Sequence, residues 1–235
     1  ARRPRRFVPQ PATDPSFAEA WARFSQGHLA VRRLVAVGLG TMAFGMADIL
    51  LEPYGGQVLN LTVGSTTKLT AAVAFGTLLG FAWASRVLTR GTDPLRLAAV
   101  GALIGIPAFA AVIAAAPLGS IPIFVGGTFA IGFGAGLFAH GTLTATMNLA
   151  PKEQVGLALG AWGAIQATAA GLAIASSGVL RDVLTHVAAD RAMPWGLSGP
   201  AIGYTAVYAL EALLLLATLI AMLPFIRSPQ RAVTA

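Results

Sequence analysis

Long apolar segments separated by short polar stretches run through most of the chain. A helix needs roughly 20 apolar residues to cross the hydrocarbon core of a bilayer. The strand-length alternation of apolar and polar residues that is typical of membrane β-barrels is not seen. The pattern therefore predicts an all-α membrane protein. Its six expected transmembrane helices cover residues 33–52, 66–88, 95–116, 122–147, 155–178 and 201–226.

Polar stretches flank the predicted transmembrane domain, which occupies residues 31–226. A basic lead-in at 1–30 precedes it and a tail at 227–235 follows it. Because the chain begins at Ala1 with a basic, proline-containing stretch that suits a linker, we expect a fragment or one half of a longer protein. Apolar residues recur at helical spacing in the lead-in. They fit either an amphipathic helix at the membrane surface or a strut beneath the bundle, and they are Phe17, Trp21, Phe24 and Val31.

Composition supports the membrane assignment and charge sets the predicted orientation. Apolar residues make up 56% of the chain, charged residues 11%, and the mean hydropathy is +0.73. All but three of the 16 basic residues fall in the N-terminal stretch up to Arg33, in the second and fourth loops with their flanking turns, and in the tail; the three exceptions are Lys68, Arg181 and Arg191. By the positive-inside rule, both termini are cytoplasmic. Contacts with lipid phosphates account for the net charge of +7, so no nucleic-acid partner is expected.

Several function classes are not expected. The chain has no cysteine, and therefore no disulfide or thiolate metal site. We find no Ser-His-Asp order, metal-hydrolase motif or phosphate-binding loop, so an enzyme is not predicted.

The first span carries two carboxylates and ends in helix-breaking residues. Asp48 and Glu52 are four residues apart, so on one continuous helix they would share a face. Acids inside a membrane usually face a bundle interior and are functional candidates. Pro53 clashes one turn back, at Ile49, and the sequence that follows it, Tyr-Gly-Gly, predicts a break over residues 53–56.

Small residues four apart recur in the spans. This spacing permits close approach of helix backbones in lipid. A less favoured alternative is that some of these positions leave clefts for a flat ligand. The pairs are Gly76/Gly80, Gly101/Gly105, Gly132/Gly136 and Gly156/Gly160.

Four segments together resemble the bacteriochlorophyll delivery family, the PucC- or LhaA-type branch of the major facilitator superfamily. The resemblance runs from about residue 30 to 226 and is to the C-terminal six helices of proteins that typically have twelve. Six spans with both ends cytoplasmic also match one half of a major facilitator fold, which is itself two three-helix repeats. The four segments are residues 42–56, 132–144, 150–154 and 156–171.

The resemblance implies an assembly factor for photosynthetic light-harvesting antenna complexes in a bacterial inner, intracytoplasmic photosynthetic membrane. Bacteriochlorophyll, and carotenoid as a further option, would be the bound pigments. Antenna polypeptides, membrane lipids and a missing N-terminal six-helix half would be the partners. Two other functions stay open: half of a proton-coupled secondary transporter, and a structural subunit of a photosynthetic complex.

Candidate pigment-binding residues follow from this implication. A neutral imidazole is a good axial ligand, which favours His140, with Gly136 one turn earlier leaving space for a flat ring. An interhelical hydrogen bond is the alternative role for His140. Carboxylates also suit magnesium, which makes Glu52 and Asp48 candidates. Trp162 and Gln166, one turn apart, offer a stacking surface beside an amide, although an aromatic residue at this spacing is more often packing.

The carboxylates also have roles that need no pigment. Asp48 and Glu52 would equally serve as a proton or cation site, or pair with Lys68 or Arg181. Glu211 lies near the middle of the sixth span, where a charge is costly. We expect Glu211 to be neutral or paired with a polar group such as Gln166 or Tyr208. It is the proton or ion candidate if the chain is a transporter half, and a structural hydrogen-bonding residue otherwise.

Overall fold

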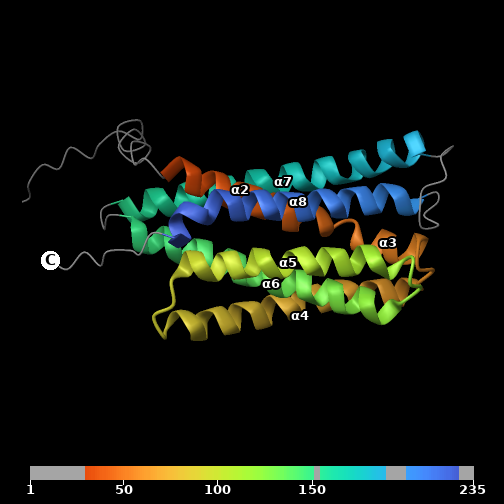
Figure 1. Ribbon diagram of the computed structural model, residues 1–235, viewed down its shortest axis with the longest axis horizontal. Coiled ribbons are helices and arrows are strands. Elements are labelled where there is room, and N and C mark those ends of the chain that lie inside the picture. Colours follow the sequence, from red (N-terminus) through yellow and green to blue (C-terminus); the bar gives the residue numbers. More distant parts are fainter. Residues whose placement is uncertain (1–29, 151–153, 189–199, 228–235) are drawn as a thin grey trace, which may run out of the picture.

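Within the described residues, six helical spans long and apolar enough to cross a membrane confirm the predicted all-α membrane fold, the first span being made of α2 and α3 (Figure 1). The computed structural model describes residues 30–150, 154–188 and 200–227. The predicted lead-in helix lies outside these residues. The helices are α2 (Ala30–Ala47), α3 (Leu51–Gln57), α4 (Val63–Leu88), α5 (Pro94–Ala115), α6 (Ile121–Leu149), α7 (Val155–Ala188) and α8 (Pro200–Arg227).

The first span is broken earlier than predicted. Helix α2 ends at Ala47, residues 48–50 form a turn, and α3 then contains Pro53 as its third residue. The expected break at 53–56 is therefore wrong. Proline is tolerated in the first turn of a helix, where its missing N–H would have no partner, but its ring excludes a helical carbonyl four residues back, at Ile49. The helix is therefore interrupted at residues 48–50, where the proline ring would otherwise clash with Ile49.

Helix α7 extends ten residues beyond its predicted end at 178, to Ala188. The predicted end left Arg181 and Asp182 outside the span. In the structure the two side chains form an ion pair, with 2.8 Å between Arg181 Nε and Asp182 Oδ1, and Arg181 also donates to the Tyr204 hydroxyl at 3.0 Å. These contacts allow the helix to continue past its charges.

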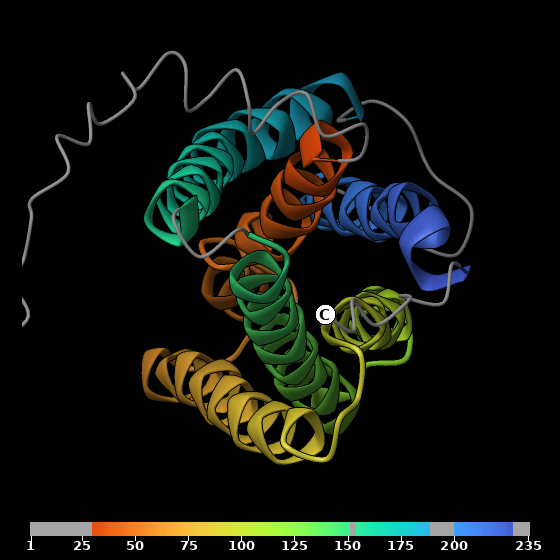
Figure 2. The same ribbon diagram turned by 90° about the vertical axis from the view of Figure 1, so that its left-hand side faces the viewer.

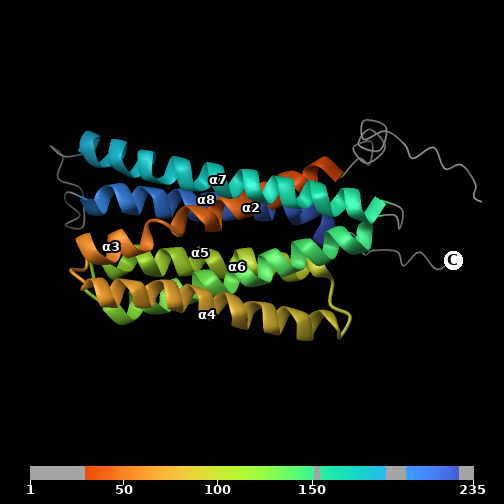
Figure 3. The same ribbon diagram turned by 180° about the vertical axis from the view of Figure 1, so that it is seen from behind.

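The helix contacts follow the pattern of two related groups of three spans. Helix α6 packs against α4 and α5, and α2 packs in the same way against α7 and α8. Contacts between α5 and α8 and between α2 and α6 join the two groups. As a result, α4 and α7 are the most peripheral helices, and they border the same side of the bundle (Figures 2 and 3).

Glycines let the main chains of α4 and α6 touch, which confirms the small-residue prediction for this pair. A Cβ atom at Gly136 would lie 2.6 Å from the Thr77 carbonyl oxygen, and one at Gly80 would lie 2.5 Å from that of Phe133. Added Cβ atoms at Gly156 and Gly160 on α7 would meet nothing within 4 Å. The same four-residue spacing therefore allows close packing of α4 against α6, whereas Gly156 and Gly160 of α7 face outward.

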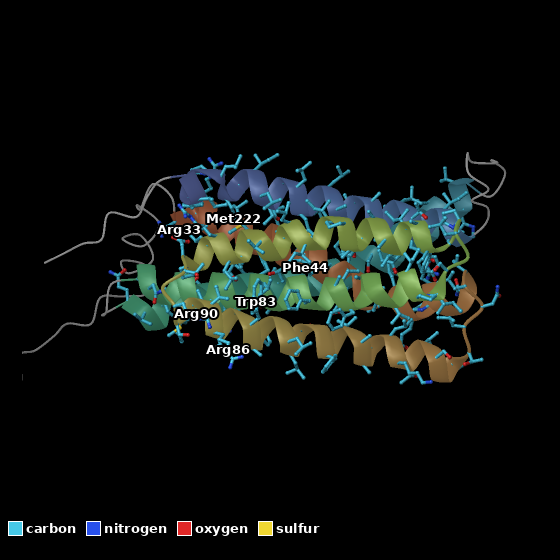
Figure 4. The ribbon with its side chains drawn as sticks, turned by 60° about the horizontal axis from the view of Figure 1, so that its bottom comes forward. Arg33, Phe44, Trp83, Arg86, Arg90 and Met222 are labelled. Atoms are coloured by element: carbon cyan, nitrogen blue, oxygen red, sulfur yellow. The ribbon has the colours of Figure 1, made fainter. Side chains whose placement is uncertain are left out.

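Arginines gather at one end of the bundle, where three of them are visible in Figure 4: Arg33, Arg86 and Arg90. At this end Arg32 donates to the carbonyl oxygens of Ile220 and Ala221 at 3.1 and 2.8 Å. These contacts hold the last turns of α8 to α2. At the same end, Arg96 of α5 donates to the Ile226 carbonyl oxygen of α8 at 3.3 Å.

Candidate functional site

A cavity of about 240 Å³ lies between α2, α4, α6 and α7, on the side bordered by α4 and α7. Four polar side chains line it: Thr41 and Asp48 from the first span, Thr77 from α4 and Gln166 from α7. Its walls are otherwise apolar. A small polar set in an apolar hollow is typical of a ligand site.

The helix break places Asp48 at this cavity. Asp48 is the first residue of the turn that follows α2, and its side chain is exposed although the residues around it belong to a transmembrane span. A continuous helix would have no turn at Asp48. The break forced by Pro53 is therefore the local feature that presents a carboxylate to the hollow.

The polar groups of the cavity differ in how well they are paired. The Thr77 hydroxyl donates to the carbonyl oxygens of Val73, at 2.9 Å, and Gly132, at 3.1 Å. The Thr41 hydroxyl is buried and has no hydrogen-bond partner within the described ranges. An unpaired buried hydroxyl costs roughly 1–3 kcal/mol. Thr41 and Asp48 thus leave polar capacity for a ligand.

Aromatic residues close the back of the cavity. Phe44, at the centre of the bundle in Figure 4, and Phe138 both line it, with ring centroids 6.0 Å apart. Phe44 also contacts Phe109 on α5, at 6.2 Å between centroids. Because these rings are packed on both sides, the apolar wall is rigid and can support a flat ligand.

Two of the predicted residues on α7 lie at or beside the cavity. Gln166 lines it. Trp162, one turn earlier, donates from its indole Nε1 to the Thr142 hydroxyl on α6 at 3.3 Å. This bond ties α7 to α6 and fixes the indole in place, so its observed role is to hold the two helices together.

Asp48 and Glu52 do not reach a common site. The Thr70 hydroxyl of α4 donates to Glu52 Oε1, and Glu52 is not among the cavity residues. The predicted shared face required a continuous helix between the two acids, and the turn at 48–50 removes it. The expected pairing of either acid with Lys68 or Arg181 is not found among the described residues, where the one ion pair joins Arg181 and Asp182.

His140 and Gly136 do not form the expected pocket. His140 is half-buried and its ring lies beside that of Phe81 on α4, with 5.8 Å between centroids. The main chain of α4 at Thr77 and Gly80 occupies the space beside Gly136. The prediction that Gly136 leaves room for a flat ring is therefore wrong, because its missing side chain serves helix packing.

The acidic and histidine side chains are dispersed. Within the described residues no three of them come close enough to hold a metal ion together. A metal that is already coordinated by an organic ring needs only one further ligand atom from the protein. Among the residues that line the cavity, Asp48 carries a carboxylate, which is the type of oxygen donor that magnesium prefers.

Glu211 is fully buried on α8, and neither of its oxygens has a hydrogen-bond partner within the described part of the chain. The predicted pairing with Gln166 or Tyr208 is therefore wrong. Gln166 faces the cavity instead, and the Tyr208 hydroxyl is likewise unpaired.

Some residues of the site were missed from the sequence. Thr41 and Thr77 carried no signal, because threonine is common in membrane helices and either residue could equally have bonded to its own backbone. Tyr208 was named as a partner for Glu211, but Tyr204 was missed, although the spacing of Tyr204, Tyr208 and Glu211 places all three on one helix face.

A family model described as "PUCC protein" matches residues 1–230. The chain is 55% identical over 228 residues to Protein PucC of Cereibacter sphaeroides, an alignment covering 96% of the chain and 48% of that protein. It is 64% identical over 171 residues to Protein PucC of Rhodovulum sulfidophilum, covering 73% of the chain and 38% of that protein.

A more distant relative carries a pigment name. The chain is 33% identical over 139 residues to a protein of Rhodobacter capsulatus named "Bacteriochlorophyll synthase 44.5 kDa chain", covering 57% of the chain and 32% of that protein. The chain spans about half the length of the PucC proteins that it matches.

Proposed function

Because the chain belongs to the PUCC protein family, we propose that it acts in the assembly of photosynthetic light-harvesting antenna complexes, without catalytic turnover. It would bind bacteriochlorophyll and dock against antenna helices in the photosynthetic membrane, with both termini in the cytoplasm. The family match along nearly the whole chain is the observation that carries this proposal. The predicted resemblance is confirmed by the same match.

The cavity is the part of the described chain best suited to the pigment. At about 240 Å³ it is smaller than the roughly 300–1,000 Å³ of pockets that enclose a ligand. A tetrapyrrole would therefore be held only in part by the hollow. This geometry suits a protein that hands a pigment on, since a ring that is not enclosed can leave sideways.

The donor atoms also suit the pigment. Asp48 would supply an oxygen ligand to magnesium, and the amide of Gln166 and the unpaired Thr41 hydroxyl would hold polar substituents of the ring. Phe44 and Phe138 would contact its apolar face. His140, beside Phe81, is the competing ligand and serves as the comparison in the test below. Carotenoid binding stays a prediction without a site.

A structural relation to one half of a major facilitator fold fits the contact pattern. Two groups of three spans with matching contacts are what an inverted three-helix repeat produces. Since the PucC relatives are about twice as long, a second six-helix body is the partner that such a half would take. The family match favours the assembly role over coupled transport, so we propose the assembly role.

The functional test replaces Asp48 with asparagine in the gene of the host organism and measures antenna absorbance of its membranes. Asparagine keeps the shape but removes the charge that favours magnesium. We expect antenna absorbance to fall about tenfold, as for a loss of roughly 1.4 kcal/mol in pigment binding. The amount of this protein in the membrane should be unchanged.

Two matched variants accompany it. Glu52→Gln removes an acid four residues away that lies outside the cavity, and His140→Ala removes the competing ligand. Both should leave antenna absorbance near the wild-type level. If Glu52→Gln or His140→Ala reduces it as strongly as Asp48→Asn does, the cavity is not the pigment site.

A further inference from the structure

The buried face of α8 carries a row of ionisable side chains. Tyr204, Tyr208 and Glu211 are spaced three or four residues apart and so lie along one face. All three are 0% exposed. They are unusual on a helix whose other residues are mostly apolar, and the pigment proposal uses none of them.

The state of Glu211 follows from its surroundings. Both of its oxygens and the Tyr208 hydroxyl lack hydrogen-bond partners within the described ranges. An unpaired carboxylate in such a place would cost several kcal/mol. A protonated carboxyl group avoids this cost and gains both a donor and an acceptor. Glu211 is therefore a buried acid that holds a proton in this conformation.

The charged and titratable groups around Glu211 come from few elements. Of the neighbouring elements, the turn after α2 carries Asp48, and α3 carries Tyr54, whose ring centroid lies 5.5 Å from that of Tyr208. Helix α5 has no titratable residue between 97 and 115, and the arginines of α2 lie at its far end. Helix α7 contributes Arg181 and Asp182, at the other end of the tyrosine row.

The row leads from Glu211 to one end of the bundle. The Tyr54 ring bridges the two tyrosines of α8, with centroids 5.5 Å from Tyr208 and 5.3 Å from Tyr204. The Tyr204 hydroxyl donates to Gln57 Oε1 at 2.9 Å and accepts from Arg181 Nη1 at 3.0 Å. Arg181 pairs with Asp182, whose side chain is 60% exposed. The hydrogen-bonded part of the row thus runs from Tyr204 to the surface, and Tyr208 lies between it and the buried acid, with no hydrogen bond joining Glu211, Tyr208 and Tyr204 among the described residues.

We propose that Glu211 is a proton-binding site that exchanges its proton with the bundle end carrying Arg181, along Tyr208 and Tyr204. On release, the carboxyl group becomes a carboxylate and the proton passes to water at Gln57 and Arg181. This inference uses no residue of the cavity as a proton donor or acceptor, so it can be tested without pigment.

The test is an infrared measurement on the whole chain reconstituted in liposomes without pigment. A protonated carboxyl group gives a carbonyl band that is separate from carboxylate bands and shifts when deuterium replaces its proton. We expect one such band that persists at neutral pH and disappears in Glu211→Gln. The glutamine variant should fold normally, because it replaces a neutral acid with a neutral amide of the same shape. Glu52→Gln should keep the band.

The route is tested by the rate at which the band shifts after transfer to heavy water. Tyr208→Phe should slow the shift at least about tenfold, since a positioned hydroxyl is removed from the proton path. Tyr54→Phe is the matched control, because its hydroxyl already donates to the Val112 carbonyl oxygen of α5, at 3.2 Å. It should leave the rate unchanged.

Three results would overturn the proposal. These are the absence of the band in the wild-type protein at neutral pH, its survival in Glu211→Gln, and equal exchange rates in Tyr208→Phe and Tyr54→Phe. Because no pigment is present in this experiment, failure here leaves the antenna role untouched, and failure of the Asp48 test leaves the proton site untouched.

Discussion

Replacing Gly136 with leucine is expected to prevent the six-helix bundle from assembling. A Cβ atom there would lie 2.6 Å from the Thr77 carbonyl oxygen and 3.2 Å from its Cα. These are main-chain atoms of α4, so they cannot rotate away. Overpacking by a few methylene groups already costs about 1–3 kcal/mol, and a leucine would separate α4 from α6 along their whole glycine seam. Size-exclusion chromatography in detergent should show little monodisperse protein.

Gly160→Leu on α7 is the matched control, with the same substitution at the same kind of motif. An added Cβ atom at Gly160 meets nothing within 4 Å, so the isolated chain should fold and elute as the wild type does. Equal behaviour of the two variants, whether both fold or both fail, would contradict the close approach of α4 and α6.

Truncating Tyr54 to alanine should produce the second large loss of stability. Tyr54 is completely buried, and its ring contacts Phe124, Tyr204 and Tyr208 at centroid distances of 5.3, 5.3 and 5.5 Å. Removing a buried aromatic side chain costs about 3–5 kcal/mol. The melting temperature in detergent should fall sharply, because α3 would lose its main contact with α8.

Two further variants distinguish the contribution of the Tyr54 ring to stability from that of its hydroxyl and from the effect of removing any aromatic ring. Tyr54→Phe removes only the hydrogen bond to the Val112 carbonyl oxygen and should cost about 1 kcal/mol. Phe75→Ala removes a ring that is 58% exposed on α4 and should have little effect. A Tyr54→Ala protein as stable as Phe75→Ala would show that α3 is not anchored by this cluster.

The helices could be predicted because their signal is local. Span length and hydropathy decide whether a segment crosses a membrane. The six predicted segments correspond to the six membrane-length spans of the described residues, the first of which is made of α2 and α3. The position of the first break was less accessible. Glycines 55 and 56 suggested that the helix ends there, yet α3 passes through both, and a Cβ atom at Gly55 would press on Leu61, Leu69 and Phe124 at 3.1 to 3.3 Å.

The site was harder to predict because it depends on which helix faces meet. Gly132/Gly136 and Gly156/Gly160 have the same spacing, but the first pair lies in the seam with α4 and the second faces outward. Similarly, four-residue spacing placed Asp48 with Glu52 only as long as the helix between them was continuous. Helical periodicity gives a residue's angle within its own helix, whereas a binding site also requires the packing of its neighbours.

The measurement that bears most directly on the central claim is the near-infrared absorption spectrum of the protein purified from its native membranes and freed of antenna subunits. The account predicts a bacteriochlorophyll band in the wild-type and Glu52→Gln proteins and its loss in Asp48→Asn. A colourless wild-type protein, or a band of equal strength in all three, would contradict pigment binding at the cavity.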